Sequence, residues 1–218
     1  MASTARRTAA LFATLALAFV AACVDLNDYG KSAPYMFHVK EKIDVAVPAN
    51  APSIRQQYMP VTREGDRGHL GIDFSAPVGT PVYAAAAGRV YLSYHEPMYG
   101  NRIILDHGKD KTGRRIFTVY KHLDTRIVSA GTRVAQGQQI GTLGETGLLS
   151  SYPHLHFEVM REISPGRRRA TGSNWWQGMV QEDPNLYWAR GVGQPTCERQ
   201  VPGGQGHLPI VYPVACRG

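Results

Sequence analysis

Residues 153–159 restrict the fold of this chain more than any other stretch. Two histidines and a glutamate alternate there with leucine, phenylalanine and valine, and this period of two predicts a β-strand. His154, His156 and Glu158 would share one face of the strand, while the apolar residues point into a core. Residues two apart on one face lie about 7 Å apart, so both imidazoles can reach one small site. One could bind a metal while the other faces a substrate beside it.

A His-x-His pair alone is common on exposed strands, so a metal site needs further ligands elsewhere in the chain. His69 and Asp73 lie in a loop that runs into a strand, and they offer an imidazole and a carboxylate, both good zinc ligands. Gly68 and Gly71 let the backbone bend there so that the two side chains can converge. Taken by itself, this His-x-x-x-Asp pattern is more typical of a surface pair.

Two other histidines stand at strand ends. Residues 117–123 alternate and predict a strand on which Thr118, Tyr120 and His122 share one face. Apolar residues occur on both faces, so the pattern does not tell which face is buried. The position of His122 at the end of this strand favours a functional role. His107 precedes a glycine turn and is interpreted as structural rather than as a metal ligand.

The composition favours β-structure. Gly 23 and Pro 14, with few long amphipathic runs, indicate many short strands and turns, and glycines recur at the predicted strand corners of residues 131–147. A formal charge of +7 suits a polyanionic partner such as nucleic acid, a membrane surface or an anionic wall polymer. The sequence has no arginine-rich helix, aromatic RNA-binding motif or Cys/His finger spacing, so we expect no nucleic-acid partner.

The first residues predict export. Arg6 and Arg7 precede an apolar run over residues 9–22, which is short for a membrane span and typical of a secretory signal. The run ends Val-Ala-Ala-Cys, which resembles a bacterial lipobox. We expect a lipoprotein signal over residues 1–22, a lipid on Cys23, and a protein anchored to a bacterial membrane facing the periplasm, with the outer membrane favoured. A plain signal peptide is the alternative.

Segments on either side of the central region are predicted as extensions. Residues 23–60 read as a lipid tether followed by a packing segment, and residues 166–218 as an extension rich in arginine and tryptophan. The tryptophans are expected to pack against the domain. In an exported protein Cys197 and Cys216 are expected to form a disulfide, closing a loop of about 20 residues; free thiols or zinc ligands are the alternatives.

Several separated motifs follow one another from about residue 68 to residue 160: His69-x-x-x-Asp73, Gly79-Thr80-Pro81-Val82, Tyr99-Gly100-Asn101, Tyr120-Lys121-His122-Leu123, the glycine-rich residues 131–147 and His154-Leu155-His156-Phe157. Together and in this order they resemble peptidase family M23, the lysostaphin- and LytM-like zinc endopeptidases. The resemblance places a peptidase domain at residues 61–165. It implies a mainly β fold, an antiparallel sheet with an open groove, carrying irregular N- and C-terminal extensions.

The same resemblance implies a site and an activity. His69, Asp73 and His156 would bind one zinc ion per chain, and His122 and His154 would be catalytic. The implied reaction is hydrolysis of peptide bonds in the stem peptides or cross-links of peptidoglycan, with zinc-bound water as the nucleophile. Which catalytic histidine acts as base and which stabilises the oxyanion is left open. A D-Ala to diaminopimelate cross-link is favoured over a glycyl-glycine bridge. Glu158 has no family role and is interpreted either as a group that supports a ligand from behind or as a surface group.

The main alternative is a non-catalytic activator of another wall hydrolase, with a cell-wall amidase or a divisome protein as partner. Such proteins lose ligands or catalytic histidines, whereas all five positions are filled here. A lipoyl-type carrier would need an exposed lysine at a hairpin tip, and residues 128–160 contain no lysine. The sequence therefore favours an enzyme.

Overall fold

The computed structural model describes residues 25–62, 67–166, 176–204 and 206–218. The predicted signal segment, Cys23 and the three arginines at 167–169 lie outside these ranges. Within them the structure is almost entirely β, and a 3-10 turn, η2 (Pro184–Leu186), is the one helical element. None of the helical residues described forms a segment long and apolar enough to cross a membrane.

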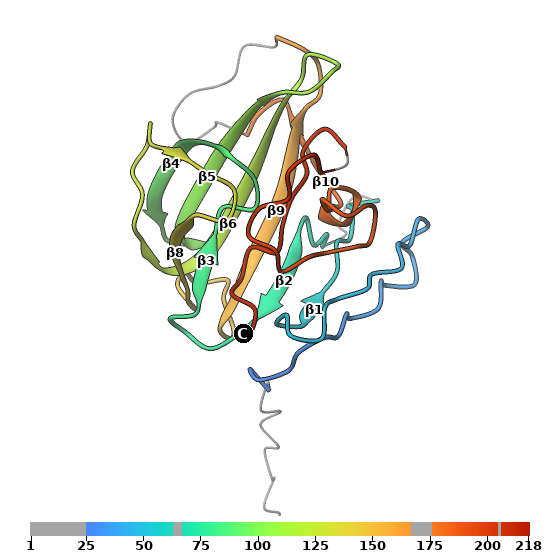
Figure 1. Ribbon diagram of the computed structural model, residues 1–218, viewed down its shortest axis with the longest axis vertical. Helices are drawn as coiled ribbons and strands as arrows, with labels where there is room; N and C mark the ends of the chain where they lie inside the picture. Colours follow the sequence, from blue (N-terminus) through green and yellow to red (C-terminus); the bar gives the residue numbers. More distant parts are fainter. Residues whose placement is uncertain (1–24, 63–66, 167–175, 205) are drawn as a thin grey trace, which may run out of the picture.

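Ten antiparallel strands make up one sheet in the described part of the chain (Figure 1). They are β1 (Ile54–Gln56), β2 (Ile72–Ser75), β3 (Pro81–Tyr83), β4 (Gly88–Glu96), β5 (Gly100–Lys109), β6 (Arg115–Arg126), β7 (Arg133–Val134), β8 (Gln139–Leu143), β9 (His154–Glu162) and β10 (Met179–Glu182). Seven follow one another across the sheet in the order β1-β2-β9-β6-β5-β4-β7, and the sheet does not close on itself. The predicted fold class, a mainly β chain with an antiparallel sheet, is confirmed.

Strand β9 is central to this arrangement, as the sequence predicts. It begins directly after Pro153 and pairs with β6 along one edge and with β2 and then β10 along the other. Leu155, Phe157 and Val159 are fully buried in the main core. Burial of these side chains fixes the register of the strand, because a shift by one residue would move them to the opposite face. The two histidines and Glu158 are thereby held together on the other face.

Strand β6 departs from simple alternation, and the predicted face of His122 is wrong. Tyr120 points into the main core and packs on Phe157, with ring centroids 5.3 Å apart. Opposite β5, however, Ile103 pairs with Tyr120 and Asn101 with Leu123, so β6 carries one extra residue between these pairs. His122 has a φ of 61°, the left-handed conformation. This bulge turns His122 away from the face of Tyr120 and toward the histidines of β9.

The C-terminal residues complete the main core. Ile210, Tyr212 and Val214 are buried in it, and Val214 bridges to Val82 of β3. Trp188 is also buried and stacks on Tyr212, as predicted for the tryptophans, whereas Trp176 is 46% exposed. Trp175 lies outside the described residues. Cys197 and Cys216 form a disulfide that holds this tail to itself.

Candidate metal centre

Three predicted ligands meet where β2 lies beside β9. Asp73 of β2 is the cross-strand neighbour of His156 on β9, and His69 stands just before β2. Asp73 Oδ1 lies 2.8 Å from His156 Nδ1 and 3.0 Å from His69 Nε2, and the two nitrogens are 3.1 Å apart. Among the described residues this is the one cluster of histidine, cysteine and acidic side chains able to hold a metal ion.

Gly71 allows this convergence. A Cβ atom at this position would lie 2.4 Å from the carbonyl oxygen of Phe157 and 2.9 Å from His156 Nε2. Neither group can move without disturbing β9, so only glycine lets the chain pass this close to the site. The sequence pointed to this glycine through its position between His69 and Asp73.

Hydrogen bonds fix the tautomer of both imidazoles in the cluster. His69 donates its Nδ1–H to the carbonyl of Gln57 at 2.8 Å, which leaves its Nε2 lone pair facing Asp73 and His156. His156 Nε2 lies 3.0 Å from a carboxylate oxygen of Glu158, to which it donates, and its Nδ1 is left for the cluster. Such partners on the far nitrogen orient metal-ligating histidines.

The donor set fits zinc. Two imidazole nitrogens and one carboxylate oxygen suit zinc, and three protein ligands leave a fourth position open, as in catalytic zinc sites. Tetrahedral bonds of about 2.1 Å place ligand atoms about 3.4 Å apart, a few tenths of an ångström more than the separations seen here. Burial alone would raise the pKa of Asp73, but the neighbouring imidazoles of His156 and His69 hold it well below its usual range, so the carboxylate is ionised.

Glu158 is itself held by a buried lysine. Lys121 Nζ donates to the same Glu158 oxygen that accepts from His156, and both side chains are almost completely buried. The ammonium group also lies 4.1 Å from the ring centroid of Tyr99. Burial would raise the pKa of Glu158, but the charge of Lys121 and the bond from His156 lower it overall. Glu158 therefore supports a ligand from within the protein rather than lying at the surface, and the role of Lys121 was missed.

The two predicted catalytic histidines flank the cluster. The rings of His122 and His154 lie 4.7 Å apart, and His154 Nε2 is 3.9 Å from Asp73 Oδ1. His122 donates its Nδ1–H to the carbonyl of Thr146 at 2.8 Å, and His154 donates its Nδ1–H to that of Tyr152 at 2.7 Å. Both rings thus keep an unprotonated Nε2. Burial lowers the pKa of His154 and lowers that of His122 to about 4, so both are neutral at neutral pH.

His107 is occupied elsewhere in the sheet. Its Nδ1–H donates to the carbonyl of Ala87 at 2.8 Å, and its Nε2 lies 2.8 Å from the hydroxyl of Thr118. Burial lowers the pKa of His107 to about 4. With both ring nitrogens engaged by the protein, His107 is structural, as its position before a glycine turn predicts.

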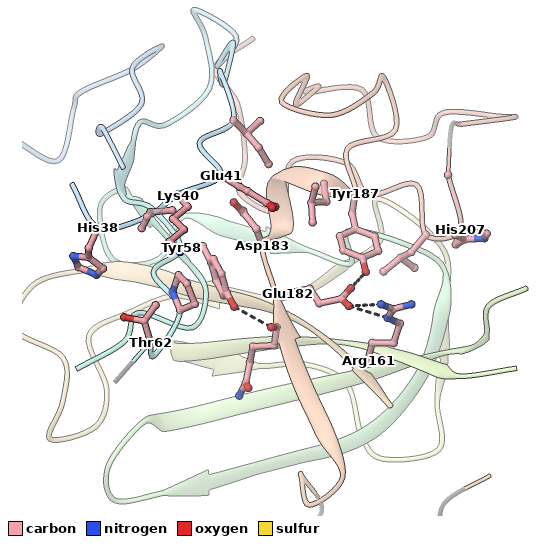
Figure 2. A pocket seen from close by; sticks show the side chains of 17 residues that line it. His38, Lys40, Glu41, Tyr58, Thr62, Arg161, Glu182, Asp183, Tyr187 and His207 are labelled. Carbon is pink, nitrogen blue, oxygen red and sulfur yellow. Dashed lines mark hydrogen bonds and ion pairs between the residues drawn. The ribbon is translucent and has the colours of Figure 1, made fainter. Parts of the chain in front are cut away.

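The five predicted site residues line one pocket of about 360 Å³. A second pocket, of about 1090 Å³, lies beside it and is drawn in Figure 2. Its walls come from residues 38–43, from Tyr58 and from the segment around Glu182, which accepts hydrogen bonds from Arg161 and Tyr187. Gln181 of β10 lines both pockets. None of the predicted site residues lines the larger one.

Comparison with known proteins identifies the central region. A model of peptidase family M23 matches residues 67–168. The peptidoglycan DD-endopeptidase ShyC of Vibrio cholerae is 44% identical over 94 residues, which are 43% of this chain and 20% of ShyC. The uncharacterized lipoprotein YgeR of Escherichia coli is 41% identical over 109 residues, 50% of this chain and 40% of YgeR.

A crystal structure of a zinc-containing peptidase from Vibrio cholerae is similar at 33% identity and a TM-score of 0.46, covering 54% of this chain and 36% of that one. The chain spans only a fifth to two fifths of the length of ShyC and YgeR. The family match covers the three clustered ligands, both flanking histidines and the strands that carry them. Residues 67–168 of this chain therefore form a peptidase M23 domain.

Proposed function

We propose that this protein is a zinc metalloendopeptidase that hydrolyses peptide bonds in the stem peptides or cross-links of peptidoglycan. The observation that carries the proposal is the cluster of His69, Asp73 and His156, in which the unprotonated nitrogens of both imidazoles face a common point. Two further histidines with free Nε2 atoms stand beside it. The name of the relative ShyC, a peptidoglycan DD-endopeptidase, supports the substrate class.

In this proposal the three clustered side chains hold one zinc ion, which supplies Lewis acidity toward water and toward the carbonyl of the scissile bond. His122 and His154 handle protons. Each enters the reaction neutral because its pKa is lowered, so one of them accepts the proton of the attacking water at Nε2. The resulting N–H donates to the developing oxyanion or protonates the leaving amine. The carbonyls of Thr146 and Tyr152 keep the rings oriented through both steps.

The bond we favour is a D-Ala to diaminopimelate cross-link. The DD-endopeptidase name of ShyC supports this choice over a glycyl-glycine bridge. The basic composition of the chain, +7 in formal charge, would favour its approach to an anionic wall polymer.

The test uses purified cross-linked muropeptide dimers with the purified protein, zinc being supplied at one equivalent. We expect the dimer to be cleaved, with product masses that name the bond. We also expect His154→Ala to retain zinc while losing at least about 100-fold in kcat, a typical contribution of general acid–base catalysis. Zinc binding with no cleavage by the native protein, but with stimulation of an added cell-wall amidase, would instead support the activator.

We further propose that the chain is exported and anchored by a lipid on Cys23. The apolar run and lipobox-like residues before it support this, as does the name of the relative YgeR, a lipoprotein. Cells grown with labelled palmitate should incorporate the label into the native protein and not into Cys23→Ser. Equal labelling of both would rule out Cys23 as the lipid site, and no labelling of either would favour the plain signal peptide.

A further inference from the structure

We infer that Asn185 is a positioning residue for the metal centre: it acts through the Gln57 side chain to hold the carbonyl that orients His69. This inference rests on the proposed zinc site. Asn185 and Gln57 both lie outside residues 67–168, the part of the chain that matches the family model. The extensions would then be part of the metal site and not only a cover for the core.

The first link is the hydrogen bond from His69 Nδ1 to the Gln57 carbonyl, at 2.8 Å. Gln57 follows directly after β1, and Met59 exchanges backbone hydrogen bonds with His69. A small rotation of the Gln57 peptide group would remove the acceptor, and the proton of His69 could then move to Nε2. Nε2 is the atom that faces Asp73 and His156, so a proton there would block it as a ligand.

The second link fixes the side chain of Gln57, which is 4% exposed. Its Nε2 donates to the hydroxyl of Ser32 at 2.6 Å, and its Oε1 accepts from Asn185 Nδ2 at 2.8 Å. One partner comes from the N-terminal segment and the other from the C-terminal extension. With both ends of the amide engaged, Gln57 cannot turn without leaving a buried polar group unpaired.

The third link immobilises Asn185, which is fully buried in η2. Trp188 donates its Nε1–H to Asn185 Oδ1 at 2.9 Å, and the Asn185 Nδ2 group also lies 2.9 Å from the hydroxyl of Tyr35. Tyr35 in turn donates to Asp183 at 2.5 Å. Asp183, Tyr58 and the neighbouring Glu182 are drawn in Figure 2 on the wall of the larger pocket. The network therefore joins that wall to the ligand His69.

Sequence patterns cannot reveal this arrangement. The group that contacts His69 is a backbone carbonyl, which any residue at position 57 would supply. What is specific to this chain is the pair of side chains that hold the Gln57 amide from opposite sides.

The test compares Asn185→Leu and Ser32→Ala with the native full chain, in the metal-free state and with zinc. Ile210→Val is the matched control, because Ile210 is fully buried in the same tail and its side chain has no polar contact with Gln57. In the metal-free protein, nitrogen NMR shifts report whether the proton of His69 sits on Nδ1, and the exchange of that proton with water reports how firmly it is held. Zinc affinity is measured by competition with a chromophoric chelator.

We expect the His69 Nδ1 proton to exchange at least about tenfold faster in Asn185→Leu, and zinc affinity to fall by roughly tenfold, the lower end for groups that orient a ligand. Ser32→Ala should change proton exchange and zinc affinity in the same direction but by less. If Asn185→Leu does not fold, Ser32→Ala alone tests the inference. Ile210→Val should change neither. Native exchange and native tautomer in both variants would overturn the inference, as would an equal change in Ile210→Val. The tautomer is measured in the metal-free protein. If the protein bound no zinc, the proposed function would be wrong, but the tautomer measurement would still test this inference.

Discussion

At the residue scale, His122 combines the side chain proposed for proton transfer with an unfavourable backbone conformation. It is the one non-glycine residue with a positive φ among those the structure describes, and the bulge that produces this φ also turns its ring toward His154. A side chain in the left-handed region costs about 1–2 kcal/mol. The position of this imidazole beside His154 is therefore obtained at some cost in stability.

The comparison of His122→Gly with His122→Ala isolates that cost. Both variants lose the imidazole, so both should lose hydrolysis. Glycine tolerates a φ of 61° and alanine does not, so His122→Gly should be more stable in urea unfolding by about 0.5–1 kcal/mol, after the larger unfolded-state entropy of glycine is taken into account. An alanine variant as stable as the glycine variant would contradict the strained conformation.

Glu158 should matter to the metal site and to stability by separate routes. Glu158→Gln leaves the charge of Lys121 buried without its partner, which should cost about 3 kcal/mol in the free energy of unfolding. It also weakens the acceptor that orients His156, so zinc affinity should fall by about tenfold or more. The double variant Lys121→Met/Glu158→Gln should regain most of the stability and little of the zinc affinity. Failure of the double variant to regain stability would show that the buried pair is not the cause.

At the element scale, β9 could be predicted and β6 only in part. Alternation identified β9 and its buried residues, because Leu155, Phe157 and Val159 all go to one core. The same rule assigned His122 to the face of Tyr120, because a single extra residue opposite β5 leaves no mark in the pattern of polar and apolar side chains. Lys121 was missed because apolar residues fall on both faces of the predicted strand, and only the fold places its ammonium group against Glu158, whose partner across the strands is Val119.

His107 links three neighbouring elements and should make their stability depend on pH. It lies on β5 and bonds to Ala87 before β4 and to Thr118 on β6. Its folded pKa of about 4 is below the ordinary value of 6.5, so between these values the unfolded chain binds a proton that the folded chain does not. The free energy of unfolding should therefore fall as pH decreases from 6.5 to 4, by about 2–3 kcal/mol from this group.

Unfolding in urea at several pH values would measure this contribution by comparing native protein with His107→Gln. The variant should lose part of the pH dependence, whereas His38→Gln, which changes an exposed histidine, should keep all of it. An identical slope in the native protein and His107→Gln would contradict the assignment.

At the scale of the whole molecule, the C-terminal tail is part of the core. Its residues are buried against the sheet, and the disulfide closes a segment of 19 residues in sequence separation. Two cysteines in a chain expected to be exported suggested that pair. The position of the tail beside β3 could not be predicted, because short buried segments without periodicity carry no partner information.

Removing the disulfide should test the importance of the tail. Cys197→Ser/Cys216→Ser should lower the free energy of unfolding by about 3 kcal/mol, because a loop of this length restricts the unfolded chain by about that amount. For a chain of this size the melting temperature should fall by roughly 6–12 °C in calorimetry. The native protein under reducing conditions should show the same loss, and an unchanged melting temperature would mean that packing alone holds the tail.

The central claim is that His69, Asp73 and His156 hold one zinc ion on which hydrolysis depends. The most direct measurement adds zinc stepwise to metal-free protein and follows bound zinc and muropeptide cleavage in the same samples. We predict that both rise together and level off at one zinc per chain, and that His156→Ala shows neither. Cleavage by the metal-free protein at the full rate would contradict this claim. So would cleavage that reaches its maximum while no zinc is bound at this cluster.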